Sequence, residues 1–162
     1  MDIDIKCDEG RFKLRSCGAI VSGDYMLVDK ARNFDGFVYL GGHVALGENS
    51  KDTIIRESRE ELQVEVEIEK LICINENIYP ISNGESVAHE VSFYYLLKPT
   101  TELPLQDITT TEVDNGVEIT HHYSWVKLAE AREKNVRPSW LAEMILTGTE
   151  NYYHLSDQTE KL

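Results

Sequence analysis

The chain has 162 residues, enough to bury a hydrophobic core, and we expect a single domain over residues 1–162. Its 16 basic residues are outnumbered by 29 acidic ones, and the net charge of −13 disfavours electrostatic binding to nucleic acid or to an anionic membrane surface. A small anionic ligand is still compatible with this charge, because metal ions or local cations reverse the field at a site.

Cysteine content and apolar patterning favour a cytoplasmic protein. The three cysteines, Cys7, Cys17 and Cys73, are odd in number and match no zinc-binding spacing, which favours free buried thiols in a reducing compartment. No apolar run approaches the ~18 residues of a membrane span. The acidic start MDIDIKCDEG does not resemble a secretory signal. We therefore expect no membrane association.

The first elements along the chain are predicted to be strands. Residues 12–21 (FKLRSCGAIV) form one strand and residues 25–29 (YMLVD) its hairpin partner. Residues 37–40 form a short apolar strand that runs into Gly41-Gly42, and this glycine pair allows a close backbone approach.

Four basic side chains that precede the glycine pair are candidates for contacting substrate phosphates. They are Arg11, Lys13, Arg15 and Arg32. The ordinary alternative for each is a solvated surface side chain.

A helix is predicted to begin after the glycine pair. Asn49 or Ser50 can cap its N-terminus, and Asp52 stands at the capping-box offset from Asn49. Ile55 and Leu62 are expected to anchor its buried side.

Three carboxylates on this helix carry the strongest functional signal. Because an α-helix turns by roughly 100° per residue, Glu57, Glu60 and Glu61 are predicted to share one narrow face. Like charges at this spacing destabilise a helix. A hard divalent cation such as Mg²⁺ or Mn²⁺ removes the repulsion, because it prefers oxygen ligands. The spacing therefore predicts a metal site that can bind a diphosphate.

The ordinary alternative is a solvated acidic helix face, which is the usual interpretation of an isolated glutamate pair. Here a larger set of positions holds a fixed spacing, which a shuffled chain of this composition reproduces about once in 10⁴. Those positions are Gly42, Glu48, Arg56, Glu57, Glu60 and Glu61. The regular spacing favours the metal site.

After this helix the chain alternates strands and loops and ends in helical segments. Residues 98–116, rich in Thr and Pro, are predicted as irregular or edge structure, and residues 128–134 as helix. Pro138 can begin a last helix that runs to Gly148, and order in the polar tail from Thr149 is left open. This pattern favours an α+β fold with helices flanking a mixed sheet. The remaining predicted strands are residues 64–68, continuing through residues 71–74, and residues 87–97 and 119–126.

The segment from Gly42 to Val64 resembles the Nudix box, G-x5-E-x7-R-E-U-x-E-E-x-G-U, in which U is aliphatic. It matches at the positions above and at Val64, whereas Ser58 replaces an aliphatic residue and Gln63 replaces the final glycine. Neither departure falls on a metal-ligand position. The family's glycine closes the helix in a left-handed turn, where a non-glycine costs roughly 1 kcal/mol. Ser58 is expected to reduce the apolar area on the helix's buried side.

The resemblance implies a Nudix-type α/β/α sandwich and a metal-dependent hydrolase that splits the pyrophosphate bond of a nucleoside diphosphate linked to another moiety. Candidate substrates are a nucleoside triphosphate, an ADP-ribose-like nucleotide and a dinucleoside polyphosphate. One alternative is a non-catalytic nucleotide-binding sensor, which the repulsive carboxylate cluster disfavours. Another is a hydrolase for RNA 5′ ends, which the net charge disfavours. A homodimer is expected, because dimers are common for this fold.

The resemblance also implies residue roles. Glu57, Glu60 and Glu61 would bind the metal together with the Gly42 carbonyl, or Glu57 would instead orient or deprotonate the attacking water. Arg56 would form a salt bridge that aims the carboxylates.

Supporting and additional groups are expected outside this cluster. Glu48 would support the loop or a water on the metal. Nudix proteins often take a further acid from a loop near a late strand that ends in Trp. Glu118 is the first candidate and Glu112 the second, with exposed loop acids as the alternative for both. His121 and His122 are adjacent on a predicted strand, so they point to opposite faces and cannot share one metal.

Overall fold

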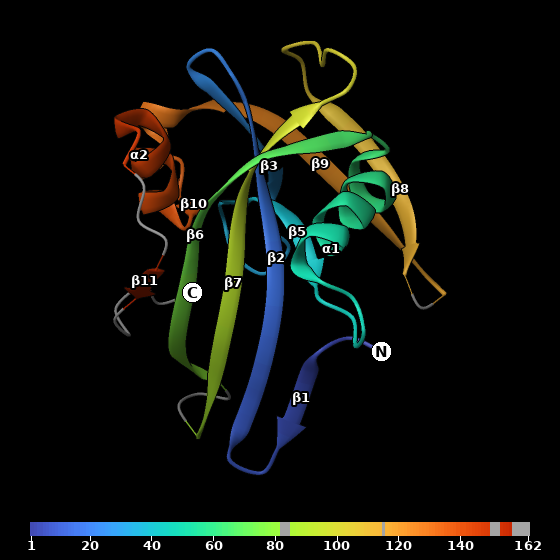
Figure 1. The fold of residues 1–162 in the computed structure, drawn as a ribbon, viewed down its shortest axis with the longest axis vertical. Coiled ribbons are helices and arrows are strands. Elements are labelled where there is room, and N and C mark those ends of the chain that lie inside the picture. The colour runs from blue at the N-terminus through green and yellow to red at the C-terminus, as the bar shows by residue number, and fades with distance from the viewer. Residues whose placement is uncertain (82–84, 115, 150–152, 157–162) are drawn as a thin grey trace.

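A β-sheet forms the centre of the molecule in the computed structural model, which describes residues 1–81, 85–114, 116–149 and 153–156 (Figure 1). Its strands are β1 (Asp4–Cys7), β2 (Gly10–Ser22), β3 (Tyr25–Lys30), β4 (Phe37–Val38), β5 (Leu40–His43), β6 (Val66–Ile81), β7 (Ser86–Pro99), β8 (Ile108–Asp114), β9 (Val117–Lys127), β10 (Val136–Arg137) and β11 (Tyr153–Ser156). The helical segments are α1 (Ser50–Glu57), η1 (Ser58–Leu62), η3 (Leu128–Glu130) and α2 (Ser139–Thr147).

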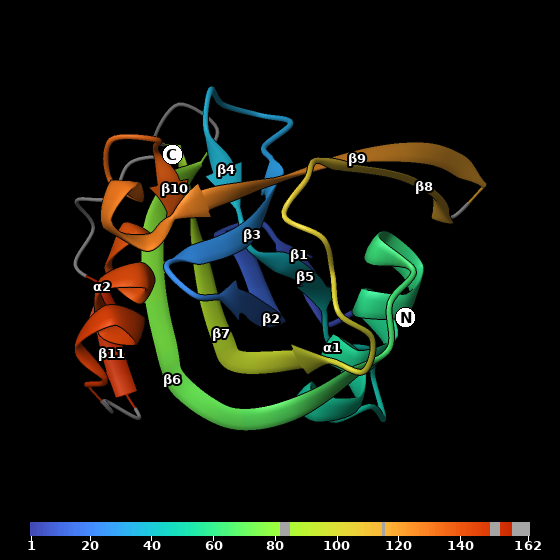
Figure 2. The ribbon, with the colours of Figure 1, turned by 90° about the horizontal axis from the view of Figure 1, so that it is seen from above.

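The sheet is mixed, as predicted. Its hydrogen-bonded order is β10-β4-β3-β2-β7-β6-β11, with β1 and β5 also paired to β2 and the β8–β9 hairpin joined to β3. Strand β2 pairs in parallel with β7 and antiparallel with β3. The helices α1 and α2 cover opposite faces of this sheet, as two perpendicular views show (Figures 1 and 2). The predicted α/β/α sandwich is therefore confirmed.

Helix α1 packs closely on the sheet because β2 has a glycine beneath it. An added Cβ at Gly18 would lie 2.2 Å from Leu97 Cδ1 and 3.1 Å from Ile54 Cγ1. The missing side chain leaves room for Ile54, which is fully buried. Leu62 is buried as expected, whereas Ile55 is only partly buried.

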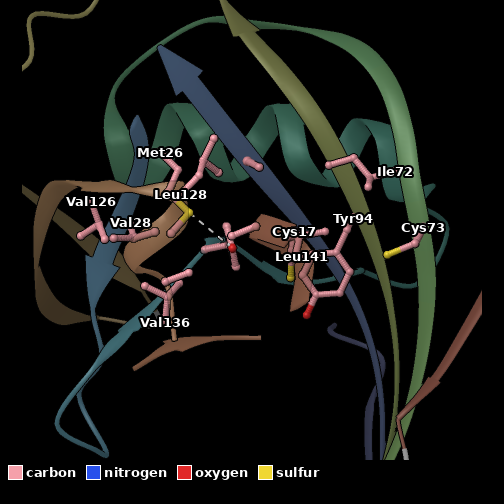
Figure 3. Packing of buried hydrophobic residues seen from close by; sticks show 14 residues of the cluster. Cys17, Met26, Val28, Ile72, Cys73, Tyr94, Val126, Leu128, Val136 and Leu141 are labelled. Atoms are coloured by element: carbon pink, nitrogen blue, oxygen red, sulfur yellow. Dashed lines mark hydrogen bonds between the residues drawn. The ribbon is translucent and has the colours of Figure 1, made fainter. Parts of the chain in front are cut away.

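Helix α2 packs on the other face, over a second hydrophobic core (Figure 3). Cys17 of β2 and Tyr94 of β7 lie beside Leu141 of α2 in this core. The Tyr94 ring also meets Trp140 edge to face, with 5.7 Å between ring centroids. These contacts bury one side of α2 against the sheet.

The helix boundaries largely follow their capping residues. Asn49 is the N-cap of α1, and its Oδ1 accepts hydrogen bonds from the backbone N–H groups of Lys51 and Asp52, both at 3.0 Å. Pro138 precedes the first turn of α2, and Gly148 ends that helix in the left-handed conformation. Both predicted helix starts are confirmed.

The C-terminal end of the first helical region is not regular α-helix. After Glu57 the chain continues as the π-helix η1, whose turn is wider because hydrogen bonds run from i to i+5. Gln63 follows with φ 61° and ψ 33°, so the predicted left-handed closure is confirmed. Ser58 is fully buried, and its hydroxyl lies 2.9 Å from the Ile55 carbonyl oxygen and 3.0 Å from that of Val64. The Ser58 hydroxyl therefore stabilises the end of the helical segment, in addition to reducing the apolar area on its buried side.

The later elements follow their predictions with one exception. The strand predicted from Val64 and continuing through Ile74 is β6, which starts at Val66, extends to Ile81 and has register shifts against β7. Part of the segment 98–116 is strand β8, which pairs only with β9 among the described residues and thus lies at an edge. The helix predicted over residues 128–134 is only the 3₁₀ turn η3.

The expectation of buried thiols is correct for two cysteines and wrong for one. Cys17 and Cys73 are buried and free, whereas Cys7 is free but exposed at the end of β1. Apart from β11, the expectation for the tail from Thr149 concerns residues outside those described. Within the described ranges, no helix has the length and apolar character that a membrane crossing requires.

Candidate active site

The carboxylates of the acidic segment lie against the glycine pair of β5. An added Cβ at Gly42 would lie 2.3 Å from Oε1 of Glu57 and 2.6 Å from its Oε2. At Gly41, where φ is +142°, an added Cβ would lie 2.2 Å from the Ser16 carbonyl oxygen. At Gly41 the backbone leaves no room for a side chain, whereas at Gly42 the space is filled by the end of the Glu57 side chain, which rests directly on the backbone of β5.

The π-helical turn places the three box carboxylates in different environments. Glu57 is 8% exposed and Glu61 is 9% exposed, whereas the side chain of Glu60 is 49% exposed. The prediction that all three lie on one regular α-helix is wrong, because Glu60 and Glu61 belong to the π-helix η1, although Arg56 Nη1 still bridges Glu57 and Glu60. Two carboxylates are therefore buried and the third lies at the rim.

Glu61 is held by groups from several strands. Its Oε2 accepts hydrogen bonds from the Gly41 N–H at 3.3 Å and from the Tyr123 hydroxyl at 3.2 Å. The Thr110 hydroxyl donates to the backbone carbonyl of Glu61. Burial, followed by the charge of Glu57, raises the pKa of the Glu61 carboxyl to about 8. A carboxylate with so little solvation gains from a bound cation.

Arg56 connects three of the acidic residues. Its Nε and Nη2 each lie 3.0 Å from a carboxylate oxygen of Glu48, while Nη1 lies 2.7 Å from Glu57 Oε1 and 2.8 Å from Glu60 Oε2. Nη2 also donates to the His43 carbonyl oxygen at 3.3 Å. Such a bidentate fork fixes orientation as well as charge. The expected salt bridge that aims the carboxylates is present.

Glu48 closes the loop that leads from β5 into α1. Its Oε2 accepts from the Ala45 N–H at 3.3 Å and from the Thr53 hydroxyl at 2.9 Å. The hydrogen bonds from Arg56 lower the pKa of the Glu48 carboxyl below its usual value. With its oxygens engaged in this way, Glu48 supports the loop.

The β8–β9 hairpin brings a further acid to the buried carboxylates. Ligand atoms of Glu61, Glu112 and His121 all lie within 4.8 Å of one another. Glu118 pairs with Val113 one register position away, so its side chain lies on the opposite face of the hairpin, where it is exposed. The structure therefore reverses the order of the two candidates and places Glu112 in the site.

His121 positions Glu112 from behind. Its Nδ1 lies 2.7 Å from Asp29 Oδ2 and its Nε2 lies 3.2 Å from Glu112 Oε1. The hydrogen bond to Asp29 raises the pKa of His121 to about 9 despite burial, so both ring nitrogens donate at neutral pH. His122 is exposed, which confirms that the two histidines point to opposite faces.

Sequence analysis did not find Asp29 or Tyr123 as part of the site. Asp29 follows the apolar residues of β3. An acid at the end of an apolar strand was the one sequence feature that could have indicated a site residue. Tyr123 lies in an aromatic-rich strand and is 1% exposed, so its pattern matched ordinary core packing.

The donor set fits a hard divalent cation. Burial raises the pKa of both Glu57 and Glu61, so a cation nearby would favour the ionised form of each carboxyl. Carboxylates occupy both nitrogens of His121, so the groups left for a metal are oxygens. Oxygen ligands suit Mg²⁺ or Mn²⁺. Glu57, Glu61 and Glu112 would hold the ion, with Glu60 at the rim.

The basic candidates lie at different distances from this cluster. Arg15 donates from Nη2 to the Gly41 carbonyl oxygen at 3.1 Å, which places it beside the site. Arg11 and Lys13 come before Arg15 on the same strand, β2, and lie farther from the cluster. Arg32 is exposed in the segment after β3.

Comparisons with known proteins agree with this geometry. The NUDIX domain model matches residues 14–146. Among solved structures, the chain is similar to an ADP-ribose pyrophosphatase from Streptococcus suis, with 17% identity, a TM-score of 0.56 and coverage of 89% of this chain and 98% of that one. It is also similar to the mutator MutT protein from Bacillus halodurans, with 18% identity, a TM-score of 0.61 and coverage of 88% of each chain.

A UDP-X diphosphatase is similar as well, at 14% identity and a TM-score of 0.54, with 89% of this chain and 66% of that chain covered. At such low identities the likeness to these structures shows the fold alone. No curated protein matches the chain in sequence.

Proposed function

Because the chain belongs to the NUDIX family and is a pyrophosphohydrolase of that family, we propose that it requires a divalent metal and acts on a nucleoside diphosphate linked to another moiety. Mg²⁺ or Mn²⁺ is the proposed cofactor. The proposed substrate classes are a nucleoside triphosphate, an ADP-ribose-like nucleotide and a dinucleoside polyphosphate.

One observation carries the proposal: carboxylates from two separate parts of the chain lie close together, two of them buried beside the glycine pair and the third partly buried. Glu57 and Glu61 come from the helical segment and Glu112 from the β8–β9 hairpin. Arg56 pairs with Glu57 and His121 with Glu112, whereas among the described residues the Glu61 carboxylate accepts only from the neutral Gly41 N–H and Tyr123 hydroxyl. A buried charge without a cationic partner is costly, which a bound metal ion would relieve. A purely structural helix end has no need of these acids.

A divalent cation bound by these oxygens would neutralise the diphosphate and make a water molecule more acidic. The residues of this chain then have distinct tasks. Glu57, Glu61 and Glu112 bind and orient, and Arg56 holds Glu57 and Glu60 in place through its salt bridges.

The proton of the attacking water goes to Glu57 or to Glu112. Glu112 is held by His121, which Asp29 fixes from the other side, so its carboxylate is well positioned to accept a proton. Glu57 rests on the Gly42 backbone and is aimed by Arg56. These are two alternative hypotheses for the group that accepts the proton. Comparing Glu57→Gln with Glu112→Gln distinguishes them.

The structural neighbours support hydrolysis, since those matched include an ADP-ribose pyrophosphatase and a UDP-X diphosphatase. A non-catalytic nucleotide sensor is the second possibility. The complete network of Arg56 with three acids argues against it, because a binding protein gains nothing from aiming several carboxylates at one point.

Glu61→Gln tests the proposed function directly. The amide keeps the size of the side chain but removes a charged metal ligand, so we expect turnover to fall by roughly 100-fold or more. The assay measures phosphate release with Mg²⁺ and with Mn²⁺ from nucleoside triphosphates, ADP-ribose, sugar nucleotides and dinucleoside polyphosphates. Glu118→Gln, on the outer face of the hairpin, is the matched control and should retain full activity.

An active Glu61→Gln enzyme would remove the metal-ligand assignment. Nucleotide binding without hydrolysis of any substrate would favour the sensor. The expected homodimer is tested separately by light scattering of the purified protein.

A further inference from the structure

Three cations alternate along the first half of β2. Arg11, Lys13 and Arg15 occupy every second position, so their side chains share one face of the sheet. At the rise of a β-strand they form a row about 13 Å long. Three of the chain's 16 basic side chains thus lie in one row.

The two cations farther from the metal site are held by partners on neighbouring strands. Arg11 forms a salt bridge with Asp4 of β1. Lys13 lies 3.8 Å from Glu90 Oε2, and its Nζ donates to the Tyr79 hydroxyl at 2.9 Å. Arg11 and Lys13 are therefore held in place by residues of neighbouring strands, unlike freely solvated surface side chains.

Among the described residues, Arg15 forms no such salt bridge with an acid. Its Nη2 donates to the Gly41 carbonyl oxygen, but its Nε is buried and has no hydrogen-bond partner in that part of the chain. His43, its register neighbour on β5, likewise has a buried Nε2 without a hydrogen bond, 3.9 Å from Asp4 Oδ2. Buried polar groups are almost always paired. Two unpaired nitrogens side by side therefore point to a ligand that supplies acceptors.

A single residue, Gly41, connects this row to the metal site. The Gly41 N–H donates to Glu61 at 3.3 Å, and the Gly41 carbonyl accepts from Arg15 at 3.1 Å. A diphosphate bound at Glu57 and Glu61 would therefore have Arg15 as its neighbour, followed along β2 by Lys13.

We propose that the row of Arg15, Lys13 and Arg11 binds a further phosphate of the substrate, beyond the diphosphate that is cleaved. Guanidinium and ammonium groups are the side chains that recognise phosphate. This inference rests on the proposed function and narrows it to substrates with an additional phosphate. A nucleotide with an uncharged sugar, such as ADP-ribose, would leave the buried Nε of Arg15 without an anion.

Binding of inorganic anions tests the row without turnover. With Ca²⁺ as the divalent cation, calorimetry compares the affinities for triphosphate and for pyrophosphate. We expect wild-type protein to prefer triphosphate at least about tenfold, and Arg15→Gln and Lys13→Gln to bring the two affinities within about twofold. Arg132→Gln and Lys134→Gln remove the same charge from exposed side chains in the turn after η3 and should keep the preference.

Charge-conserving variants guard against a merely structural effect. Arg15→Lys and Lys13→Arg retain the positive charge and should retain most of the triphosphate preference. Thermal unfolding identifies any variant that fails to fold. Equal affinities in wild-type protein, or an unchanged ratio in both glutamine variants, would overturn the proposal.

Hydrolysis then identifies where the extra phosphate lies. ATP and diadenosine tetraphosphate carry it in the phosphate chain, ADP-ribose 2′-phosphate carries it on the sugar, and ADP-ribose lacks it. The glutamine variants should raise KM only for substrates that carry it. If Glu61-dependent hydrolysis occurs with no triphosphate preference, the row is refuted and the proposed function stands. If the preference is found and no substrate is hydrolysed, the proposed function fails and the anion site stands.

Discussion

At Gly42 the carboxylate of Glu57 packs directly against the backbone. The Glu57 carboxylate lies where a Cβ would be, so the absence of a side chain at residue 42 decides where the acid sits. A Cβ there would meet only the end of a flexible side chain, which can move away. A side chain at residue 42 should therefore leave the fold intact but displace the Glu57 carboxylate.

Gly42→Ala is expected to displace Glu57 and to weaken metal binding by roughly 10- to 100-fold, the range seen when groups that orient ligands are lost. Calorimetric titration with Mn²⁺ measures this, and circular dichroism checks that the secondary structure is unchanged. Wild-type Mn²⁺ affinity in the alanine variant would show that Glu57 does not need this space.

Ser58 and Gln63, the two departures from the box pattern, both act at the end of the helical segment. Ser58 uses its hydroxyl at the carbonyl groups of Ile55 and Val64. Gln63 takes the left-handed conformation that a glycine would adopt more readily, and its Nε2 lies 3.4 Å from the Thr111 carbonyl oxygen. The helical segment therefore still ends in a left-handed turn, although Ser58 and Gln63 replace the aliphatic residue and the glycine of the box pattern.

Gln63→Gly should be neutral or should raise the free energy of unfolding by up to about 1 kcal/mol, because glycine relieves the left-handed strain. Gln63→Ala loses the same long hydrogen bond without relieving the strain, so it should be the less stable of the two. Urea unfolding compares both with the wild type. Clear destabilisation by glycine would contradict a strained left-handed closure.

The β8–β9 hairpin shows that element register decides which acid enters the site. It lies beside the helical segment (Figure 2) and contacts it through Thr110 and Gln63. Because side chains alternate along a strand, a shift of one residue would exchange the inner and outer faces. Pairing of β9 with β3 sets this register and also brings His121 to Asp29.

Glu112→Gln and Glu118→Gln form a matched pair on the two faces of this hairpin. We expect Glu112→Gln to lower kcat/KM by at least about tenfold, since it touches the buried cluster, and Glu118→Gln to leave it unchanged. Steady-state kinetics with the best substrate of the panel measures both. Equal effects from the two variants would mean that the register does not select the acid.

On the scale of the whole molecule, one sheet separates two cores. The core under α1 faces the carboxylate site, and the core under α2 contains Cys17 and Cys73. Burial raises the pKa of the Cys17 thiol to about 11 and that of Cys73 to about 12. Cys7 lies outside both cores on strand β1.

Thiol labelling at pH 8 should therefore modify Cys7 alone in the native protein and all three cysteines in denaturant. The two buried thiols are both inaccessible and protonated at that pH, whereas Cys7 is exposed. Mass spectrometry of the labelled protein counts the modified residues, and Cys7→Ser is the control. Rapid native labelling of Cys17 would show that the core under α2 is open to solvent.

Much of the local structure and the box chemistry could be predicted from the sequence, because the deciding groups lie within a few residues of one another. The Asn49 cap, the left-handed Gln63 and the salt bridges from Arg56 to Glu57 and Glu60 are of this kind. Their spacing along a helix or turn is enough to bring the groups together.

Only the tertiary structure decided which distant groups complete the site. Asp29 and His121 meet because β3 pairs with β9, and Glu112 rather than Glu118 faces the cluster because of strand register. Arg15 reaches Gly41 through the pairing of β2 with β5. Side-chain alternation within a strand is visible in a sequence, but which face meets which neighbour depends on long-range hydrogen bonding between strands.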